Sequence, residues 1–256
     1  MTSPIICFGQ QPCGFFPKKF LVAKISQARI LQKNIGGKII FFYHDSDADY
    51  RETITIMTDR QTRAEVRLNF TQENKIQKKF SPLYLKRIPS DWKAEILKQL
   101  PRFVEKDLIF LFESTDQKLL ADFCLDMYKK MGLLDGIEIM RSSEKNFRLT
   151  APELNTDYFA DIPYEGEVVR AQLIDNKFQL HEGGGKYTVI SSPAEILKDQ
   201  KTPGRDQRFG WMNSVIKSTH YITGNAEFDY LKRDEFPNVE FIKREQIDNY
   251  DNAWIS

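Results

Sequence analysis

The sequence predicts an α/β fold built on a parallel sheet, with small antiparallel β insertions. Two buried apolar runs, residues 5–8 and 38–43, flank an amphipathic helix expected over about residues 17–34. The first run ends at Gly9, and the second run ends in a cluster of aspartates. This order is that of a βαβ unit, in which ligand sites lie beyond the carboxyl ends of the strands. We therefore expect a small-molecule site near the N-terminus, between the two polar loops.

The first part of the predicted core covers residues 1–144. Pro17 suits the start of the helix, where a missing N–H group costs little, and Gly36 suits its end. From residue 52 to residue 72 the apolar residues alternate with polar ones, which predicts an inserted antiparallel β-hairpin. The other elements expected in this part are helices over about 91–104 and 116–131 and a core strand over 137–140.

Residues 145–190 are predicted to form a small antiparallel β insertion, because short alternating runs are separated by turns. Its expected strands are 147–149, 166–173, 177–180 and 187–190, with 161–167 as a connection. Glycines 183–185 are predicted to form a hairpin turn, since strands flank them on both sides. Residues 191–256 are expected to return to the core. They are predicted to contain helices over about 193–199 and 205–217, a strand over 221–223, a helix from about 225 and a strand over 239–242.

The composition excludes several classes of protein. Lysine and arginine total 37 and aspartate and glutamate 36, so a net charge of +1 gives no basic excess for nucleic acid. No apolar run approaches the roughly 18 residues of a membrane span, and no signal-peptide pattern is present. The three cysteines, Cys7, Cys13 and Cys124, are too scattered for a disulfide framework or a zinc site. We expect a cytoplasmic protein with a small-molecule substrate and no nucleic-acid or membrane partner.

The first polar loop and the helix after it each allow two interpretations. The backbone N–H groups of Gly9, Gln10 and Gln11 suit an anion at a helix N-terminus, or the segment is an ordinary strand-to-helix loop. Lys24 shares a helix face with apolar residues. It either extends to the surface or points its ammonium into a polar crevice. Without a counter-ion there, Lys24→Met should weaken ligand binding and leave stability unchanged or raised.

Carboxylates follow both the second strand and the strand at 221–223. The first group consists of His44, Asp45, Asp47 and Asp49. Such side chains could hold Mg²⁺, hydrogen-bond a substrate or act as a general base, or they form a solvated turn. Asn225 is a predicted N-cap, which places Glu227 in the first helical turn. Glu227 either complements the helix dipole or faces the same crevice as the aspartates.

Several segments resemble the cysteine-adding enzymes of bacillithiol biosynthesis, the BshC family. Gly9, Gln10 and Gln11 followed by Lys24 look like the family's Gly-Gln-Gln motif and its helix lysine. Residues 46–52 are similar to its acidic segment. Residues 202–208 and 221–230 look like its Ser-Pro-Asn-x-x-x-Arg and Tyr-Val-Gly-Gly-Pro-Gly-Glu-Ile-Ala-Tyr segments. The segments follow the family's order and span most of the chain.

The resemblance implies a Rossmann-like core of the HUP type, and the sequence departs from the family in several places. Ala48 stands where the family has a histidine between two aspartates, and Thr223 stands at the first glycine of its Gly-Gly-Pro-Gly. The family's chains are longer, with connecting domains and a C-terminal coiled coil for dimerisation. No heptad pattern follows Tyr230. We expect a compact, divergent relative that is a monomer or a weak homodimer.

Two hypotheses about function follow from the resemblance. In the first, the chain is a ligase that joins a small carboxylate such as cysteine to an amine of the amino-sugar type, with ATP or another nucleotide as the candidate cofactor and no metal assigned. In the second, it is a catalytically inactive small-molecule or nucleotide-binding protein that keeps the cleft. Catalytic roles fall on Lys24, Asp47, Asp49, Arg208 and Glu227, because the cations would stabilise negative charge and the carboxylates would bind or deprotonate the amine. Substrate or nucleotide binding falls on Gly9, Gln10, Gln11, Tyr221, Gly224 and Asn225.

Overall fold

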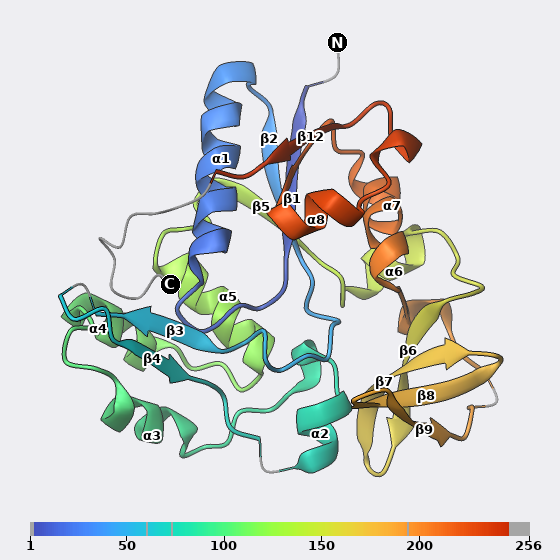
Figure 1. Ribbon diagram of the computed structural model, residues 1–256, viewed down its shortest axis with the longest axis horizontal. Coiled ribbons are helices and arrows are strands. Elements are labelled where there is room, and N and C mark those ends of the chain that lie inside the picture. The colour runs from blue at the N-terminus through green and yellow to red at the C-terminus, as the bar shows by residue number, and fades with distance from the viewer. Residues whose placement is uncertain (1–2, 60, 73, 194, 246–256) are drawn as a thin grey trace.

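A five-stranded, all-parallel sheet with the order β12-β11-β1-β2-β5 forms the centre of the protein. The computed structural model describes residues 3–59, 61–72, 74–193 and 195–245 (Figure 1). The strands of the sheet are β1 (Ile5–Gln10), β2 (Lys38–Tyr43), β5 (Ile137–Arg141), β11 (His220–Thr223) and β12 (Glu240–Lys243). The expected α/β class with a parallel, Rossmann-like core is confirmed.

Helices cover both faces of this sheet, because successive apolar side chains along its strands point to opposite faces and both faces must be buried. Ile6 and Phe8 of β1 pack in one core with α1 (Lys19–Ile35) and α5 (Leu120–Lys130). Cys7 of β1 packs in a second core with α6 (Lys145–Thr150) and α7 (Arg205–Ile216). In Figure 1, α1 and α7 accordingly lie on either side of the strands.

The strand order reverses at β1, which fixes where a ligand is expected. The chain builds the sheet outward from β1 through β2 to β5, and then returns to the other side of β1 with β11 and β12. In open parallel sheets the crevice beyond the carboxyl ends of the strands, at such a reversal, is the usual binding place. Here that place lies between the ends of β1 and β11.

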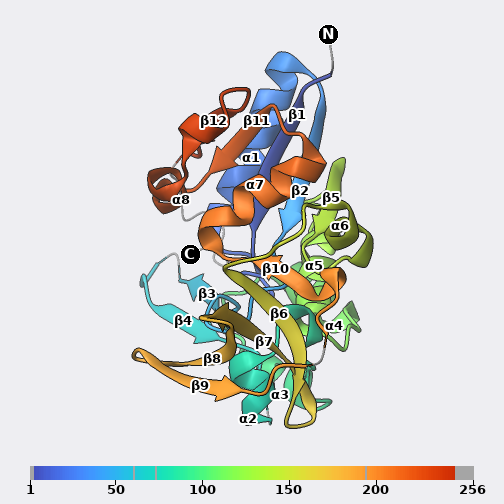
Figure 2. The ribbon, with the colours of Figure 1, turned by 90° about the vertical axis from the view of Figure 1, so that its right-hand side faces the viewer.

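Two antiparallel sheets lie beyond the carboxyl ends of the parallel strands, in the lower half of Figure 1. The predicted hairpin is confirmed as β3 (Thr55–Thr58) paired with β4 (Glu65–Leu68). The larger sheet has the order β10-β6-β7-β8-β9. Its strands are β6 (Tyr158–Tyr164), β7 (Glu167–Ile174), β8 (Lys177–Gly183), β9 (Lys186–Ile190) and β10 (Lys201–Pro203). Glycines 183–185 connect β8 to β9, as the sequence predicts. Figure 2 shows the larger sheet from its side, below α7.

Short helices complete the described chain. The α-helices not yet named are α2 (Lys75–Phe80), α3 (Trp92–Gln99), α4 (Lys106–Ser114) and α8 (Asn225–Tyr230). The 3-10 turns are η1 (Leu83–Leu85), η2 (Lys198–Gln200) and η3 (Arg233–Glu235). Within the described residues, none of the helices combines the length and the apolar character that crossing a membrane requires. Residues 246–256, which end the last predicted segment, lie outside the described residues.

Several predicted elements are wrong. The strand expected at 147–149 is part of α6, because the ring of Phe147 packs on Phe42 and Trp211 from a helical turn. A run of three residues shows no period that separates a strand from a helix. The helix expected over 193–199 is not formed in its described part, since residues 195–197 are irregular and only η2 follows. The connection expected at 161–167 belongs largely to β6.

Other boundaries shift for local reasons. The helix expected over 91–104 ends at Gln99, because Pro101 disfavours helical backbone in the residue before it. The helix expected over 116–131 begins only at Leu120, after Leu119 forms a β-bridge with Arg87. No element was expected at the positions of α2, α4 and β10.

Candidate functional site

A crevice opens where the strand order reverses, and we call it the sheet-edge crevice. Its volume is about 370 Å³, within the range of small-molecule sites. Residues 9–11, His44 and residues 224–227 all line it, so the segments that follow β1, β2 and β11 meet in one crevice. The other lining residues are Phe20, Lys24, Glu52, Arg208, Tyr230 and Arg244.

Lys24 reaches this crevice from α1 and is only 3% exposed. Its ammonium donates to the carbonyl oxygen of Gly9 at 2.8 Å and to the carboxylate of Glu227 at 2.8 Å. The interpretation in which Lys24 extends to solvent is therefore excluded. The expectation that Lys24→Met leaves stability unchanged is wrong in its premise, because Glu227 supplies the counter-ion.

Glu227 is held in one orientation by two groups besides Lys24. It accepts from the hydroxyl of Tyr221 at 2.8 Å and from the backbone N–H of Gly224 at 3.1 Å. Burial raises the pKa of Glu227, but Lys24 and these hydrogen bonds outweigh burial and bring the pKa below its usual value. Gly224, rather than the predicted Asn225, is the N-cap residue of α8, and Asn225 is its first helical residue. The carboxylate of Glu227 takes the N-capping role, because Gly224 carries no side-chain oxygen.

Gly9 lets two polar side chains approach the end of β1. A Cβ atom at this position would lie 2.6 Å from Nε2 of His44 and 2.8 Å from the hydroxyl oxygen of Tyr221. Both distances are well inside van der Waals contact, so a larger residue would displace one of these groups. Gly9 therefore acts by making room for His44 and Tyr221.

Asp47 closes the crevice on the side of the loop that follows β2. We call this loop, residues 44–50, the acidic loop. Its carboxylate accepts from the amide of Gln11 at 2.6 Å and from the guanidinium of Arg208 at 3.2 Å. The backbone N–H of Ala48 donates to it at 2.7 Å. Burial raises the pKa of Asp47, but Arg170 and Arg208 with the backbone N–H groups hold it well below its usual range. Asp47 is therefore an anion at neutral pH and a weak base.

His44 lines the crevice, although the sequence named it only within the candidate group at residues 44–49 and not in the catalytic or binding set. It is buried at the end of β2, with its ring edge against Phe42. Burial and the positive charges of Arg208 and Lys24 lower its pKa well below its usual value. The imidazole is therefore neutral at physiological pH, with one unprotonated ring nitrogen, and it is a weaker base than a free histidine side chain. Its position directly after a buried strand was the only signal in the sequence.

Two of the aspartates do not reach the crevice. Asp45 is fully buried and binds the guanidinium of Arg141 at 2.6 Å and the hydroxyl of Ser143 at 2.7 Å, which ties the ends of β2 and β5 together. Asp49 pairs with Arg51 and lines a neighbouring cavity. Among the described residues, no three His, Cys, Asp or Glu side chains are grouped so that they could hold a metal ion. Cys13 is buried and contacts the hydroxyl of Tyr128.

The crevice thus combines ionised carboxylates, cations and one neutral imidazole. The residues of the predicted site that line it are Gly9, Gln10, Gln11, Lys24, Arg208, Gly224, Asn225 and Glu227. Asp47 and Tyr221 hydrogen-bond to members of this set. Such an arrangement can bind an amine through a carboxylate and an anionic group through a guanidinium.

Comparison of the chain with protein-family models gives no match, and neither does a search of curated proteins.

Proposed function

We propose that the sheet-edge crevice is the active site of a BshC-like ligase of the HUP class, which forms a carbon–nitrogen bond between a small carboxylate such as cysteine and an amine of the amino-sugar type. One observation carries this proposal. Lys24, Asp47, Arg208 and Glu227 come from sequence segments up to 203 positions apart and converge in two ion pairs around one crevice. These are the positions that the resemblance selects.

In this proposal the two ion pairs bind different groups, with Glu227 binding the amine and Arg208 binding the carboxylate. Glu227 is ionised and lines the crevice, so it can hold the ammonium group of an incoming amine. Arg208 keeps Asp47 in place with one Nη atom, and its guanidinium offers further donors to a carboxylate. Lys24 orients Glu227 and adds positive potential near the end of β1, where negative charge would develop during acyl transfer.

His44 is the best-placed group for moving a proton. An amine must lose a proton to attack a carbonyl carbon, and a neutral imidazole has an unprotonated ring nitrogen that can receive it. The neutral imidazole lines the same crevice as Glu227. We therefore give His44 the role of general base that the resemblance spreads over Asp47, Asp49 and Glu227. The histidine missing at Ala48 is replaced in this scheme by one that comes four residues earlier.

A nucleotide fits the donors of this crevice. The buried Nε of Arg244 has no hydrogen-bond partner within the described part of the chain, and Arg208 lines the same space. These two guanidinium groups would hold phosphate oxygens. When bound, the nucleotide supplies activation of the carboxylate, which is otherwise a poor electrophile. The backbone of Gly9 does not form a phosphate cradle, because His44 and Tyr221 fill the space beside it.

The experiment is a product assay with ATP, cysteine and an amino sugar, read by mass spectrometry. The wild type should form the coupled amide, whereas Arg208→Met and His44→Gln should each lower the rate at least 100-fold. Lys33→Met on the exposed end of α1 is the matched control and should keep full activity. Absence of any coupled product with cysteine and other small carboxylates would contradict the ligase proposal.

The second candidate is a catalytically inactive binding protein with the same cleft. Ala48 favours it, since a methyl group replaces the histidine of the family at a loop that lies beside the crevice. Calorimetry separates the two candidates. Binding of a nucleotide, cysteine or amino sugar that Arg208→Met abolishes, without product formation, would support the inactive protein. We further propose that the protein acts in the cytoplasm. We also propose that it is a monomer or weak homodimer, and sedimentation at micromolar concentration tests this oligomeric state.

A further inference from the structure

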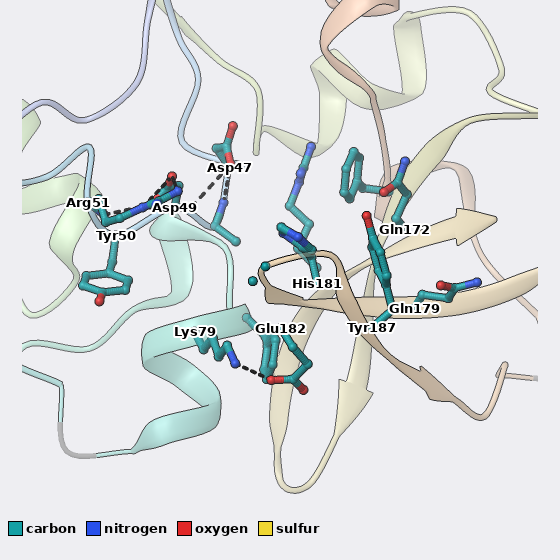
Figure 3. Close-up of a pocket in the computed structure, with 16 residues that line it drawn as sticks. Asp47, Asp49, Tyr50, Arg51, Lys79, Gln172, Gln179, His181, Glu182 and Tyr187 are labelled. Carbon is teal, nitrogen blue, oxygen red and sulfur yellow. Dashed lines mark hydrogen bonds and ion pairs between the residues drawn. The ribbon is translucent and has the colours of Figure 1, made fainter.

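A second cavity lies between the acidic loop and the larger antiparallel sheet, and we call it the insertion cavity. Its volume is about 560 Å³. Figure 3 shows Asp47 and Asp49 of the loop on one side and Gln172, His181 and Tyr187 of the sheet on the other. The cavity therefore has a wall from the parallel core and a wall from the insertion. It has the size of a small-molecule site.

Charged groups at the rim of this cavity are already paired. Arg51 binds Asp49 at 2.6 Å, and Lys79 binds Glu182 (Figure 3). Both pairs are partly exposed to solvent, so each charge is compensated by its partner and by water. These side chains shape the opening and carry no unmet demand for a ligand.

Arg170 in the wall of the cavity is different, because its charge is buried, Asp47 attracts it only from beyond ion-pair distance, and its hydrogen-bond donors are incompletely used. It is 9% exposed, and its guanidinium lies over the ring of Phe159 at 3.6 Å. Its Nη2 donates to the carbonyl oxygen of Pro203 over a long 3.4 Å, and its buried Nε has no partner among the described residues. Within the described chain no carboxylate lies within 4 Å of this guanidinium. A buried cation with unused donors calls for an anionic partner.

The sheet side of the cavity supplies groups for the rest of a ligand. Gln172 and Gln179 face each other across β7 and β8, and both line the cavity. Their amides can donate and accept, as hydroxyl groups do. The rings of His181 and Tyr187 lie 5.0 Å apart across β8 and β9, and Tyr187 is 49% exposed. A partly exposed aromatic pair beside amides suits the C–H face of a sugar ring.

We propose that the insertion cavity binds a small hydroxylated organic anion, with its carboxylate or phosphate on Arg170 and its hydroxylated body on Gln172 and the His181–Tyr187 pair. This inference is independent of the ligase proposal. Asp47 borders both spaces, but the proposed ligand contacts lie on Arg170, Gln172 and the His181–Tyr187 pair. The carboxylate of Asp47 is bound from the crevice side by Gln11 and Arg208. The two cavities are thus neighbours on one wall.

Calorimetric titration with four probes tests the proposal. Glucose 6-phosphate represents the phosphate source, glucuronate represents the carboxylate source, and glucose and inorganic phosphate are each one half of the ligand. At least one sugar anion should bind, at least tenfold more tightly than glucose and than inorganic phosphate. Equal binding of inorganic phosphate and glucose 6-phosphate would overturn the role of the hydroxylated body.

Two variants locate the binding. Arg170→Met should weaken the tighter sugar anion at least tenfold, and Gln172→Leu should weaken it several-fold. Arg67→Met on the exposed strand β4 is the control for loss of a positive charge and should leave the affinity unchanged. Gln172→Leu keeps the test valid if Arg170→Met fails to fold. Failure of both sugar anions to bind, or unchanged affinity in the folded variants, would overturn the proposal, whatever the result of the ligase assay.

Discussion

The sheet-edge crevice and the insertion cavity both border Asp47, but they differ in whether their buried charged groups have ion-pair partners. In the crevice, buried charges are paired with each other, as Lys24 is with Glu227. In the insertion cavity, pairs such as Lys79 with Glu182 lie at the exposed rim, whereas the buried Arg170 has no carboxylate at ion-pair distance in the described chain. The crevice is therefore organised before any ligand arrives. In the insertion cavity, the buried charge of Arg170 is attracted by Asp47 only from beyond ion-pair distance, and its Nε lacks a hydrogen-bond partner among the described residues.

This difference reflects the backbone that carries each site. The crevice groups stand on the ends of parallel strands and on α1, whose positions the two cores fix. The insertion cavity lies between a loop and a hairpin sheet. Substitutions in the crevice should therefore change stability as well as binding, whereas substitutions at the cavity rim should change stability little.

The largest effect is expected from Glu227→Gln. Without the carboxylate, the ammonium of Lys24 keeps neutral acceptors such as the carbonyl oxygen of Gly9 but has lost its counter-ion. Removing one partner of a buried ion pair leaves an uncompensated charge, so we expect a loss of about 3 kcal/mol in the free energy of unfolding. Denaturant unfolding followed by circular dichroism measures it.

A double variant and a surface control sharpen this result. Lys24→Met combined with Glu227→Gln should regain most of the loss, because no buried charge remains. Glu235→Gln removes a charge from an exposed pair with Lys232 and should change the free energy of unfolding by less than about 0.5 kcal/mol. If Glu227→Gln resembles Glu235→Gln, the crevice pair is solvated and the comparison fails.

The second effect concerns Asp47 and depends on pH. Because the pKa of Asp47 in the folded state lies below that in the unfolded chain, its charge stabilises the fold fully above about pH 5 and less as the pH falls below about 4. Asp47→Asn should therefore cost about 2 kcal/mol at pH 7 and progressively less toward pH 2. Unfolding at a series of pH values measures this difference, with Asp229→Asn as the exposed control. A cost that is the same at pH 7 and pH 2.5 would contradict the ionised Asp47.

Much of the parallel core could be predicted from the sequence, because its strands are long apolar runs. Residues 38–43 coincide with β2, and the crevice position of Lys24 was one of the two interpretations that its helix face allowed. The prediction failed where one short run decided the element. The strand expected at 147–149 became α6, because packing of Phe147 on Trp211 outweighs a three-residue pattern.

The site could be predicted only as far as its residues stand at strand ends. Gly9, Lys24 and Glu227 follow from the strand-loop-helix order together with the resemblance. Arg170 could not be found, because an arginine on an alternating strand is typical of a solvent-facing position. Only the tertiary structure shows that the guanidinium is buried, over the ring of Phe159 and beside the carbonyl oxygen of Pro203.

The third effect tests whether the crevice is close-packed at the end of β1. Gly9→Ala places a methyl group 2.6 Å from Nε2 of His44, so the imidazole or Tyr221 must move. Overpacking of this kind costs about 1–2 kcal/mol, and it should also weaken any ligand of the crevice. Gly224→Ala is the control in the same crevice, since its Cβ would meet its nearest atom, Cε of Lys24, at 4.0 Å. Similar melting temperatures for the two variants would mean that His44 is not fixed beside β1.

The smallest effect is expected at the rim of the insertion cavity. Lys79→Met removes an exposed partner of Glu182, and the side chain of Lys79 is 42% exposed. Water compensates the charge that remains, so the free energy of unfolding should change by less than about 0.5 kcal/mol. Thermal and denaturant unfolding measure it beside Glu227→Gln, and at 1 M salt the small difference should vanish because exposed pairs are screened. A loss above about 1 kcal/mol that persists at high salt would show that this rim pair is as structural as the pair between Lys24 and Glu227, and the contrast between the two cavities would then rest on Arg170 alone.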